Sequence, residues 1–206
     1  MSVAEAPSPV EPSLGDQRRA QILSAARVCF ARWGFHGASM NQICAEAQMS
    51  PGALYRYFPS KDAIIGAIAE EQQVGAGECT AALQRPGPLL DRMVATAMDY
   101  LAASRDPESG GLMVEIHSES LRNTAVGARF CEIENTVREN FRAVLEDAKT
   151  RGEIAADLDI PIVLTMMFAI GDGLLMRLQF ERDVELARIE PHLRRVVAGL
   201  LGQVSR

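Results

Sequence analysis

Apolar residues recur at helical spacing along most of the chain, and the first such stripe extends from Ile22 to Trp33. It stops at Gly34, a residue type that is common just after the end of a helix. We therefore expect a first helix that begins at Asp16 and buries the whole stripe, Trp33 included, against the elements that follow. Residues 1–15 contain three prolines and no apolar period, which predicts a flexible arm.

Two short helices separated by a tight turn are predicted next. Ser39 can cap the first of them. Its apolar face consists of Met40, Ile43, Cys44 and Ala47. The pattern then breaks, and Ser50 followed by Pro51 is typical of a new helix start, while Pro59 ends this helix and a third begins at Lys61. This order is a helix–turn–helix, which places its second helix in the major groove of DNA.

The second short helix has an inner and an outer side. Leu54 and Phe58 are four residues apart and can anchor the helix to the core. The other residues are small or can donate hydrogen bonds, which suits close contact with a sugar-phosphate backbone. They are Gly52, Ala53, Tyr55, Arg56 and Tyr57. The alternative, two half-buried tyrosines beside a solvated arginine, is outweighed by the helix–turn–helix spacing around them.

The segment GFHGASMNQICAEAQMSPGALYRYFPSK resembles the DNA-binding segment of the TetR family of transcriptional regulators, and the likeness extends from about Arg18 to Ala69. Gln48 and Met49 stand where the family usually has Gly and Val, so a non-glycine residue is expected in a left-handed conformation in the turn. Pro51 occupies a position that is often polar or charged in the family.

A DNA-contacting surface follows from this motif and from the resemblance. Lys61, Tyr57 and Ser39 are expected to bind phosphates, partly because helix N-termini attract anions. Arg56 has the long donor fork that can read base edges. The full set of DNA-binding candidates is Ser39, Met40, Ser50, Pro51, Gly52, Ala53, Tyr55, Arg56, Tyr57 and Lys61.

The remainder of the chain predicts a larger helical domain, because its apolar residues keep helical spacing and no alternating run demands a strand. The third helix of the motif is expected to continue to about Leu83. Later helices are expected from Leu90 to the Asp106–Pro107 region and over about 112–121, 124–151, 160–180 and 191–204. The predicted fold is all-α, with a helix–turn–helix domain at 16–62 and a ligand-binding and dimerisation domain at 63–206.

The last two helices bear on assembly. Apolar residues occur on nearly every face of the Ile160–Phe180 segment, so it must be covered on more than one side. A membrane span is disfavoured by Pro161, Asp172 and Arg177 within it, and burial in protein is expected instead. The resemblance implies a homodimer in which the last two helices of each subunit form a four-helix contact. The interface candidates are Leu164, Phe168, Leu175, Leu193, Val196, Val197, Leu200 and Leu201.

Charge is unevenly distributed along the chain. The formal net charge is −6, to which residues 1–15 contribute −2, residues 16–70 +2 and residues 71–206 −6, and this assigns the positive portion to the helix–turn–helix. The four cysteines include no C-x-x-C pair and the three histidines are scattered, so no metal site is predicted. This cysteine usage and the absence of a signal-peptide pattern favour a cytoplasmic protein.

The resemblance implies a ligand-responsive regulator, usually a repressor, whose dimer binds a palindromic DNA operator and is released by a small-molecule effector. An enzyme is disfavoured because no nucleophile–base pair or phosphate loop is present, and no cofactor is expected. Glu115 and Glu119 are four residues apart, but a solvated helix face is the simpler explanation for this carboxylate pair. An architectural or activating DNA-binding protein without a ligand pocket stays open as the alternative. Candidate effector contacts are Met98, Met113, His117, Cys131, Met167 and Asp172, although for the Met and Cys residues a place in the packed core is the favoured interpretation.

Overall fold

The computed structural model describes residues 13–105 and 107–202, with the side chains of 72–79 and 107–109 not included. These residues form helices and no strands, which confirms the predicted all-α fold. The helices are α1 (Leu14–Gly37), α2 (Met40–Glu46), α3 (Pro51–Tyr57), α4 (Lys61–Thr80), the 3₁₀ turn η1 (Ala81–Gln84), α5 (Leu89–Ala103), α6 (Pro107–Ser120), α7 (Thr124–Thr150), α8 (Ile160–Phe180) and α9 (Leu186–Leu200). Most of the expected arm, residues 1–12, lies outside the described residues.

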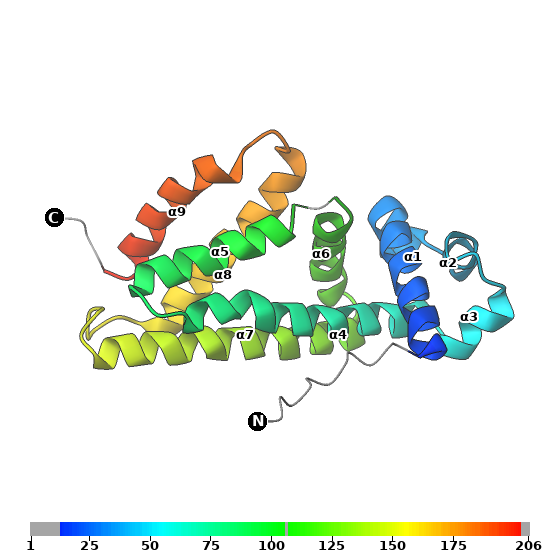
Figure 1. The fold of residues 1–206 in the computed structure, drawn as a ribbon, viewed down its shortest axis with the longest axis horizontal. Coiled ribbons are helices and arrows are strands. Elements are labelled where there is room, and N and C mark those ends of the chain that lie inside the picture. Colours follow the sequence, from blue (N-terminus) through cyan, green and yellow to red (C-terminus); the bar gives the residue numbers. More distant parts are fainter. Residues whose placement is uncertain (1–12, 106, 203–206) are drawn as a thin grey trace, which may run out of the picture.

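The helices form a small end and a large end joined by long helices (Figure 1). Helices α1, α2 and α3 form the small end, and α5, α8 and α9 lie together at the large end. Helices α4 and α7 pack side by side along the molecule. Helix α6 stands between the two ends and packs against α1 on one side and α7 and α8 on the other.

The core of the small end does not stop at the domain boundary expected at residue 62. It includes Ile64 and Ile68 from α4, and it also takes in Leu112 and Ile116 of α6 and Val126 of α7. The buried side chains of α6 therefore belong to the same core as the helix–turn–helix. A second core lies among α5, α7, α8 and α9. Since apolar burial is the main stabilising term, the orientation of the small end depends on α6.

The end of α1 departs from the sequence expectation at one residue. Gly34 has a φ of +70° and breaks the regular helix, as expected for a glycine at a helix end. Trp33, however, is 39% exposed and lies beneath the Arg32 guanidinium instead of in the core. The chain reverses at Gly34, so Phe35 (5% exposed) takes the buried place that the stripe assigned to Trp33. The helical spacing of apolar residues does not show at which residue a helix stops packing against the core.

Two helix starts also differ from the predictions. In both cases the position of a proline relative to the helix was predicted wrongly. Pro107 opens α6, where its missing N–H costs no hydrogen bond, and thus does not merely follow the end of α5. Pro191 was expected to begin the last helix, but α9 begins five residues earlier at Leu186 and Pro191 lies inside it. Proline disfavours the interior of a helix, and Pro191, the sixth residue of α9, leaves out one backbone hydrogen bond of the helix.

The turn between α2 and α3 holds Gln48 at a φ of +52°, the expected left-handed conformation without a glycine. The Gln48 N–H donates to the Ala45 carbonyl, and the next N–H, of Met49, donates to Cys44. Gln21 of α1 supports the turn by donating its side-chain amide to the Ala47 carbonyl at 2.8 Å. These bonds hold a conformation that costs a residue with a Cβ about 1–2 kcal/mol.

Replacing Gln48 with Gly is expected to stabilise the protein by about 0.5–1 kcal/mol, since relief of the left-handed strain exceeds the added freedom of the unfolded chain. Urea unfolding at fixed protein concentration measures the difference. The matched control is Ala45→Gly, an exposed position within α2, which should destabilise the protein by about 1 kcal/mol. Equal loss of stability in both variants would show that the Gln48 conformation carries no strain.

Candidate DNA-binding surface and effector region

Both short helices of the motif begin with serine caps, as predicted. The Ser39 hydroxyl accepts from the Gln42 N–H at 3.2 Å, and the Gln42 side chain accepts from the Ser39 N–H at 2.7 Å, which is a complete capping box. Ser50 caps α3 by accepting from the Ala53 N–H at 3.3 Å, with Pro51 in the first helical position. The caps fix where each helix starts and hence which residues point outward.

Helix α3 presents a clear outer side. Leu54 and Phe58 are buried at 0% and 2% exposure, so they anchor the helix as expected. Tyr55 is 49% exposed, and Arg56 is also exposed. Pro51 and Gly52 are exposed beside them, and nothing lies within 4 Å of a Cβ built on Gly52. Two other candidates, Ala53 and Tyr57, are half-buried, and the Arg56 guanidinium lies 5.3 Å from the Tyr57 ring centroid.

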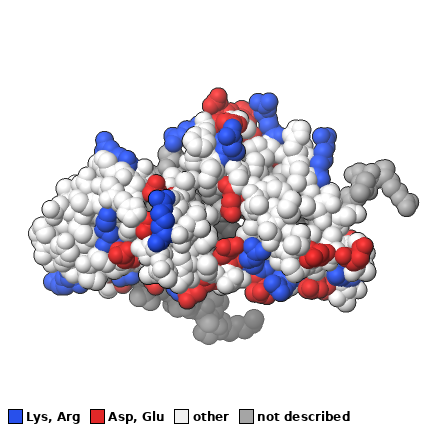
Figure 2. Space-filling model, turned by 180° about the vertical axis from the view of Figure 1, so that it is seen from behind, with Lys and Arg blue, Asp and Glu red and all other residues white. Residues whose placement is uncertain are grey.

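Charged side chains differ between the two ends of the molecule (Figure 2). The small end, on the left of that view, carries scattered basic side chains among mostly uncharged ones, with few acidic side chains. Along the lower right edge, where α7 lies, basic and acidic side chains alternate. The ion pairs within α7 include Arg129–Glu132 and Arg138–Glu134. The unevenness agrees with the charge split along the sequence and favours the small end as the surface toward an anionic partner.

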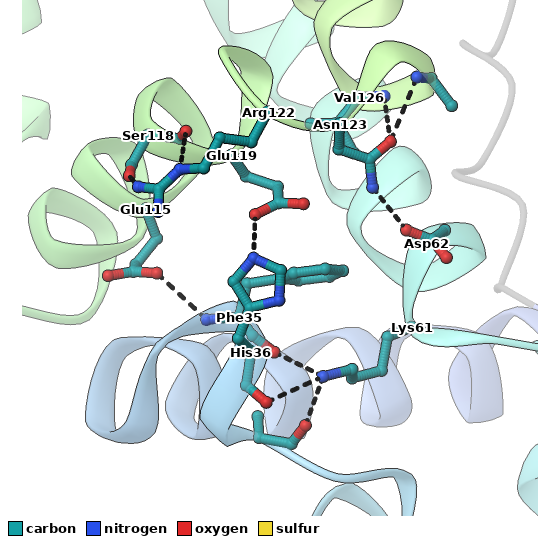
Figure 3. Close-up of polar contacts among 12 residues, drawn as sticks. Phe35, His36, Lys61, Asp62, Glu115, Ser118, Glu119, Arg122, Asn123 and Val126 are labelled. Atoms are coloured by element: carbon teal, nitrogen blue, oxygen red, sulfur yellow. Dashed lines mark hydrogen bonds and ion pairs between the residues drawn. The ribbon is translucent and has the colours of Figure 1, made fainter.

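Lys61 occupies a different place from the one expected for a phosphate contact. Its ammonium donates to the carbonyl oxygens of Phe35 and Ala38, both at 2.6 Å, and lies 3.4 Å from that of His36 (Figure 3). It also lies 4.8 Å from the Phe35 ring centroid. Carbonyls at the end of a helix lack intrahelical partners and carry partial negative charge. In this structure Lys61 neutralises them and ties the start of α4 to the end of α1.

Three of the six effector candidates come together between α6 and α8. The Nδ1 of His117 lies 2.8 Å from the Met113 carbonyl oxygen, one turn earlier on α6. The Nε2 of His117 lies 3.6 Å from Asp172 Oδ1 on α8. His117 is half-buried and the Asp172 side chain is 50% exposed, so this pair sits at the edge of the larger domain.

The other three candidates do not join this group. Met98 and Met167 are half-buried against the second core, and Met167 borders a crevice of about 40 Å³ between α5, α8 and α9. Cys131 is exposed on α7. Ligand pockets for drug-sized molecules are about 300–1,000 Å³. The crevice as it stands is therefore too small for such an effector.

Residues that the sequence reasoning missed complete the region around His117. The Phe130 ring meets the His117 ring edge to face at 4.7 Å between centroids. Arg138 donates to Glu134 at 3.0 Å and to the Thr165 hydroxyl of α8 at 3.1 Å. The four-residue spacing of Glu134 and Arg138 was visible in the sequence, but their contact with α8 depends on the tertiary fold. Polar and aromatic groups thus line the contact between α6, α7 and α8.

Comparisons with known proteins agree with the motif and the fold. Residues 22–68 match the family described as bacterial regulatory proteins, tetR family, and residues 84–197 match the tetracyclin repressor-like C-terminal domain. UidR of Escherichia coli strain K12, an HTH-type transcriptional regulator, is 32% identical over 186 residues, which cover 89% of this chain and 92% of UidR. The chain belongs to the TetR family of transcriptional regulators.

Further relatives of this TetR-family regulator are consistent with that assignment. AcnR of Corynebacterium jeikeium, an HTH-type transcriptional repressor, is 26% identical over 170 residues, covering 82% of this chain and 85% of AcnR. The structure of Salmonella enterica GusR matches with a TM-score of 0.77 at 33% identity and covers 92% of this chain and 98% of GusR. The family, UidR and AcnR are transcriptional regulators and not enzymes, which confirms that prediction.

Most residues expected at a dimer contact of this TetR-family regulator lie inside the single chain. Five of the eight side chains are exposed by 6% or less, namely Leu164, Leu175, Leu193, Val197 and Leu201. Phe168 and Leu200 are half-buried, and Val196 is 44% exposed. The apolar residues of α8 surround the helix, and the ones chosen from the sequence are buried or half-buried within the chain. Another set faces outward, the outer stripe of α8, which consists of Ile162, Met166, Ala169, Gly173, Met176 and Phe180.

The surroundings of His117 shift its proton affinity. Burial lowers the pKa of His117, but the contact with Asp172, the Met113 carbonyl and the charges of Asp172 and Glu134 together raise the pKa above its ordinary value. The geometry gives the reason. If Nδ1–H donates to Met113, a neutral ring turns a bare Nε2 toward a carboxylate that can only accept, whereas the protonated ring donates to both partners.

Protonated His117 is expected to stabilise the fold most at low pH. Because the folded pKa lies above the unfolded one, the contribution is complete below the unfolded pKa and is lost as pH rises through the folded pKa. Urea unfolding between about pH 5.5 and pH 8 should therefore show a larger fall in stability for the wild type than for Asp172→Asn. Asp183→Asn, the same charge change at another exposed carboxylate, serves as the control and should leave the wild-type slope unchanged.

Proposed function

We propose that this TetR-family regulator is a cytoplasmic homodimeric repressor that binds a palindromic operator and is released by a small-molecule effector. The observation that carries the proposal is the outer side of α3. Its exposed Tyr55 and Arg56 project from a helix that Leu54 and Phe58 hold rigidly against the core. Fixed donors on an exposed short helix fit base reading in a major groove.

A dimer is supported by the outer stripe of α8. Four of its members are among the most exposed large apolar side chains, with Ile162 at 58%, Met166 at 47%, Met176 at 49% and Phe180 at 74%. By length and composition α8 could also cross a membrane. Only 22% of its most apolar window is buried in the single chain, so apolar surface is left for a second copy to cover. Gly173 lies open in the middle of the stripe, where a second copy of α8 can approach closely. A two-fold pair then presents two copies of α3 to successive half-sites.

An effector fits best at the contact between α6, α7 and α8, where His117, Asp172 and Arg138 supply charged groups beside the Phe130 ring. The structure of FadR from Bacillus subtilis in complex with stearoyl-CoA is 17% identical and shares the fold (TM-score 0.77). Direct contacts fill this region, among them His117–Asp172 and Arg138–Thr165, so an effector that enters it must separate α6, α7 and α8. A ligand that binds the separated arrangement more tightly shifts the protein toward it.

Replacing Arg56 with Ala is expected to weaken binding to the selected operator by about 1–3 kcal/mol and to relax base preference at one or two positions of each half-site. Operator selection from random duplexes, followed by affinity titration with wild type and variant, measures both effects. Arg195→Ala on α9 makes the same charge change away from the motif and should alter neither. Identical selected operators for wild type and Arg56→Ala would remove Arg56 from base reading.

Replacing Met166 with Glu is expected to separate the dimer, because two charges per dimer would be buried at the two-fold contact. Sedimentation velocity at micromolar concentration should show folded monomer, and operator affinity should fall although α3 is unchanged. Leu121→Glu, which removes an apolar side chain that is 88% exposed outside α8, is the matched control and should stay dimeric. A folded wild-type monomer would contradict the dimer itself. Val197→Glu is unsuitable, because that side chain is 3% exposed and its replacement would unfold the chain.

A further inference from the structure

The connection between α1 and α2, residues 34–38, is held from two sides (Figure 3). We refer to it as the α1–α2 junction. On one side α6 supplies two carboxylates: Glu115 accepts from the Phe35 N–H at 3.0 Å, and Glu119 lies 3.0 Å from the His36 Nε2. On the other side Lys61 donates to junction carbonyls. The junction leads directly into the helix–turn–helix.

These contacts provide hydrogen-bond partners for the Phe35 amide and the Glu119 carboxylate, two groups that are costly to bury without one. The break at Gly34 takes the Phe35 N–H out of α1, and Phe35 itself is buried, so its amide needs an acceptor from another element. Glu119 is only 4% exposed, and a carboxylate so buried is costly without a donor. A side chain at Gly34 would place its Cβ 3.3 Å from the Glu115 carboxylate, at a φ that disfavours a Cβ. The junction and α6 therefore fit each other closely.

The opposite side of helix α6 carries His117, which belongs to the proposed effector region. Glu115 and Glu119 are one turn apart and face α1, whereas His117 lies between them in sequence and about 200° around the helix from each. His117 instead faces Asp172 of α8 and the Phe130 ring of α7. The DNA-binding end and the proposed effector region thus attach to opposite sides of the same turn of α6.

We propose that Glu115 and Glu119 are positioning residues that hold the α1–α2 junction, and with it α2 and α3, in the operator-binding orientation. A change at the His117–Asp172 pair moves this turn of α6 and so withdraws the two carboxylates from the junction. A third contact acts beside them: Asn123, which caps α7, donates to Asp62 in the first turn of α4 at 2.8 Å. The effector step of this proposal rests on the proposed regulatory function, whereas the positioning step does not.

The positioning step can be tested without DNA, by hydrogen exchange of the Phe35 amide. Glu115→Ala removes the acceptor and should speed exchange of that amide by about tenfold or more, the equivalent of one hydrogen bond to a charged group. Glu115→Gln retains an acceptor oxygen and should restore slow exchange. Glu139→Ala, at a 64% exposed carboxylate of α7, is the control and should match the wild type. Unchanged exchange in Glu115→Ala overturns the positioning role.

The regulatory step is tested on the operator selected by the wild type. Glu115→Ala should weaken operator binding by about tenfold, and Glu115→Gln should bind within about threefold of the wild type. Asp172→Asn is then combined with Glu115→Ala in a double-mutant cycle. If the two sites are coupled, the fold loss of operator affinity in the double variant is clearly less than the product of the fold losses in the two single variants. The same cycle with Glu139→Ala should be multiplicative.

The outcomes separate the two proposals. Multiplicative losses for Asp172→Asn with Glu115→Ala overturn the regulatory connection, while the exchange result still decides positioning. A wild type that selects no duplex overturns the proposed DNA-binding function and the operator-orienting role of the carboxylates with it. Loss of operator affinity in both Glu115→Ala and Glu115→Gln, with equal loss of thermal stability, shows a merely structural carboxylate and also overturns the proposal.

Discussion

The end of α1 imposes the constraint on which the two halves of the molecule depend. A helix that stops inside a protein leaves main-chain amides and carbonyls without partners, and these groups must be satisfied by other elements. After the break at Gly34 the Phe35 N–H donates to the Glu115 carboxylate, and the carbonyl oxygens of Phe35 and Ala38 accept from the Lys61 ammonium. One short junction thereby links α1, α4 and α6. The orientation of the helix–turn–helix follows from this bonding as much as from apolar packing.

Local features of the sequence predicted the motif well. The capping residues Ser39 and Ser50 and the left-handed Gln48 depend on neighbours within a few residues, so the chain specifies them directly. The same is true of the anchors Leu54 and Phe58, because helical spacing alone places them on one face. The TetR family resemblance was carried by this segment and is confirmed by relatives that cover most of the chain.

Features that depend on distant partners were less accessible. Lys61 was assigned to phosphate because its position opens a helix, but the sequence did not reveal its contact with the end of α1, more than twenty residues away. His117 and Asp172 were both named as effector candidates, yet their pairing required the packing of α6 on α8. For α8 the difficulty was different. Apolar residues around the whole helix carry no information about which side faces the chain itself, so Leu164 and Leu175 were assigned outward although they face inward.

The closed state of the larger domain bears on how an effector could act. The His117–Asp172 and Arg138–Thr165 contacts join α6 and α7 to α8, so in the proposed mechanism the free energy of separating these helices opposes ligand binding and the effector must bind the separated arrangement preferentially. Separation at α6 disturbs the side of the helix that carries Glu115 and Glu119, because a helix turn moves as a unit. The cost of opening the effector region and the loss of the junction contacts are then parts of one equilibrium. By reciprocity, operator binding that favours the closed arrangement weakens effector binding by the same factor.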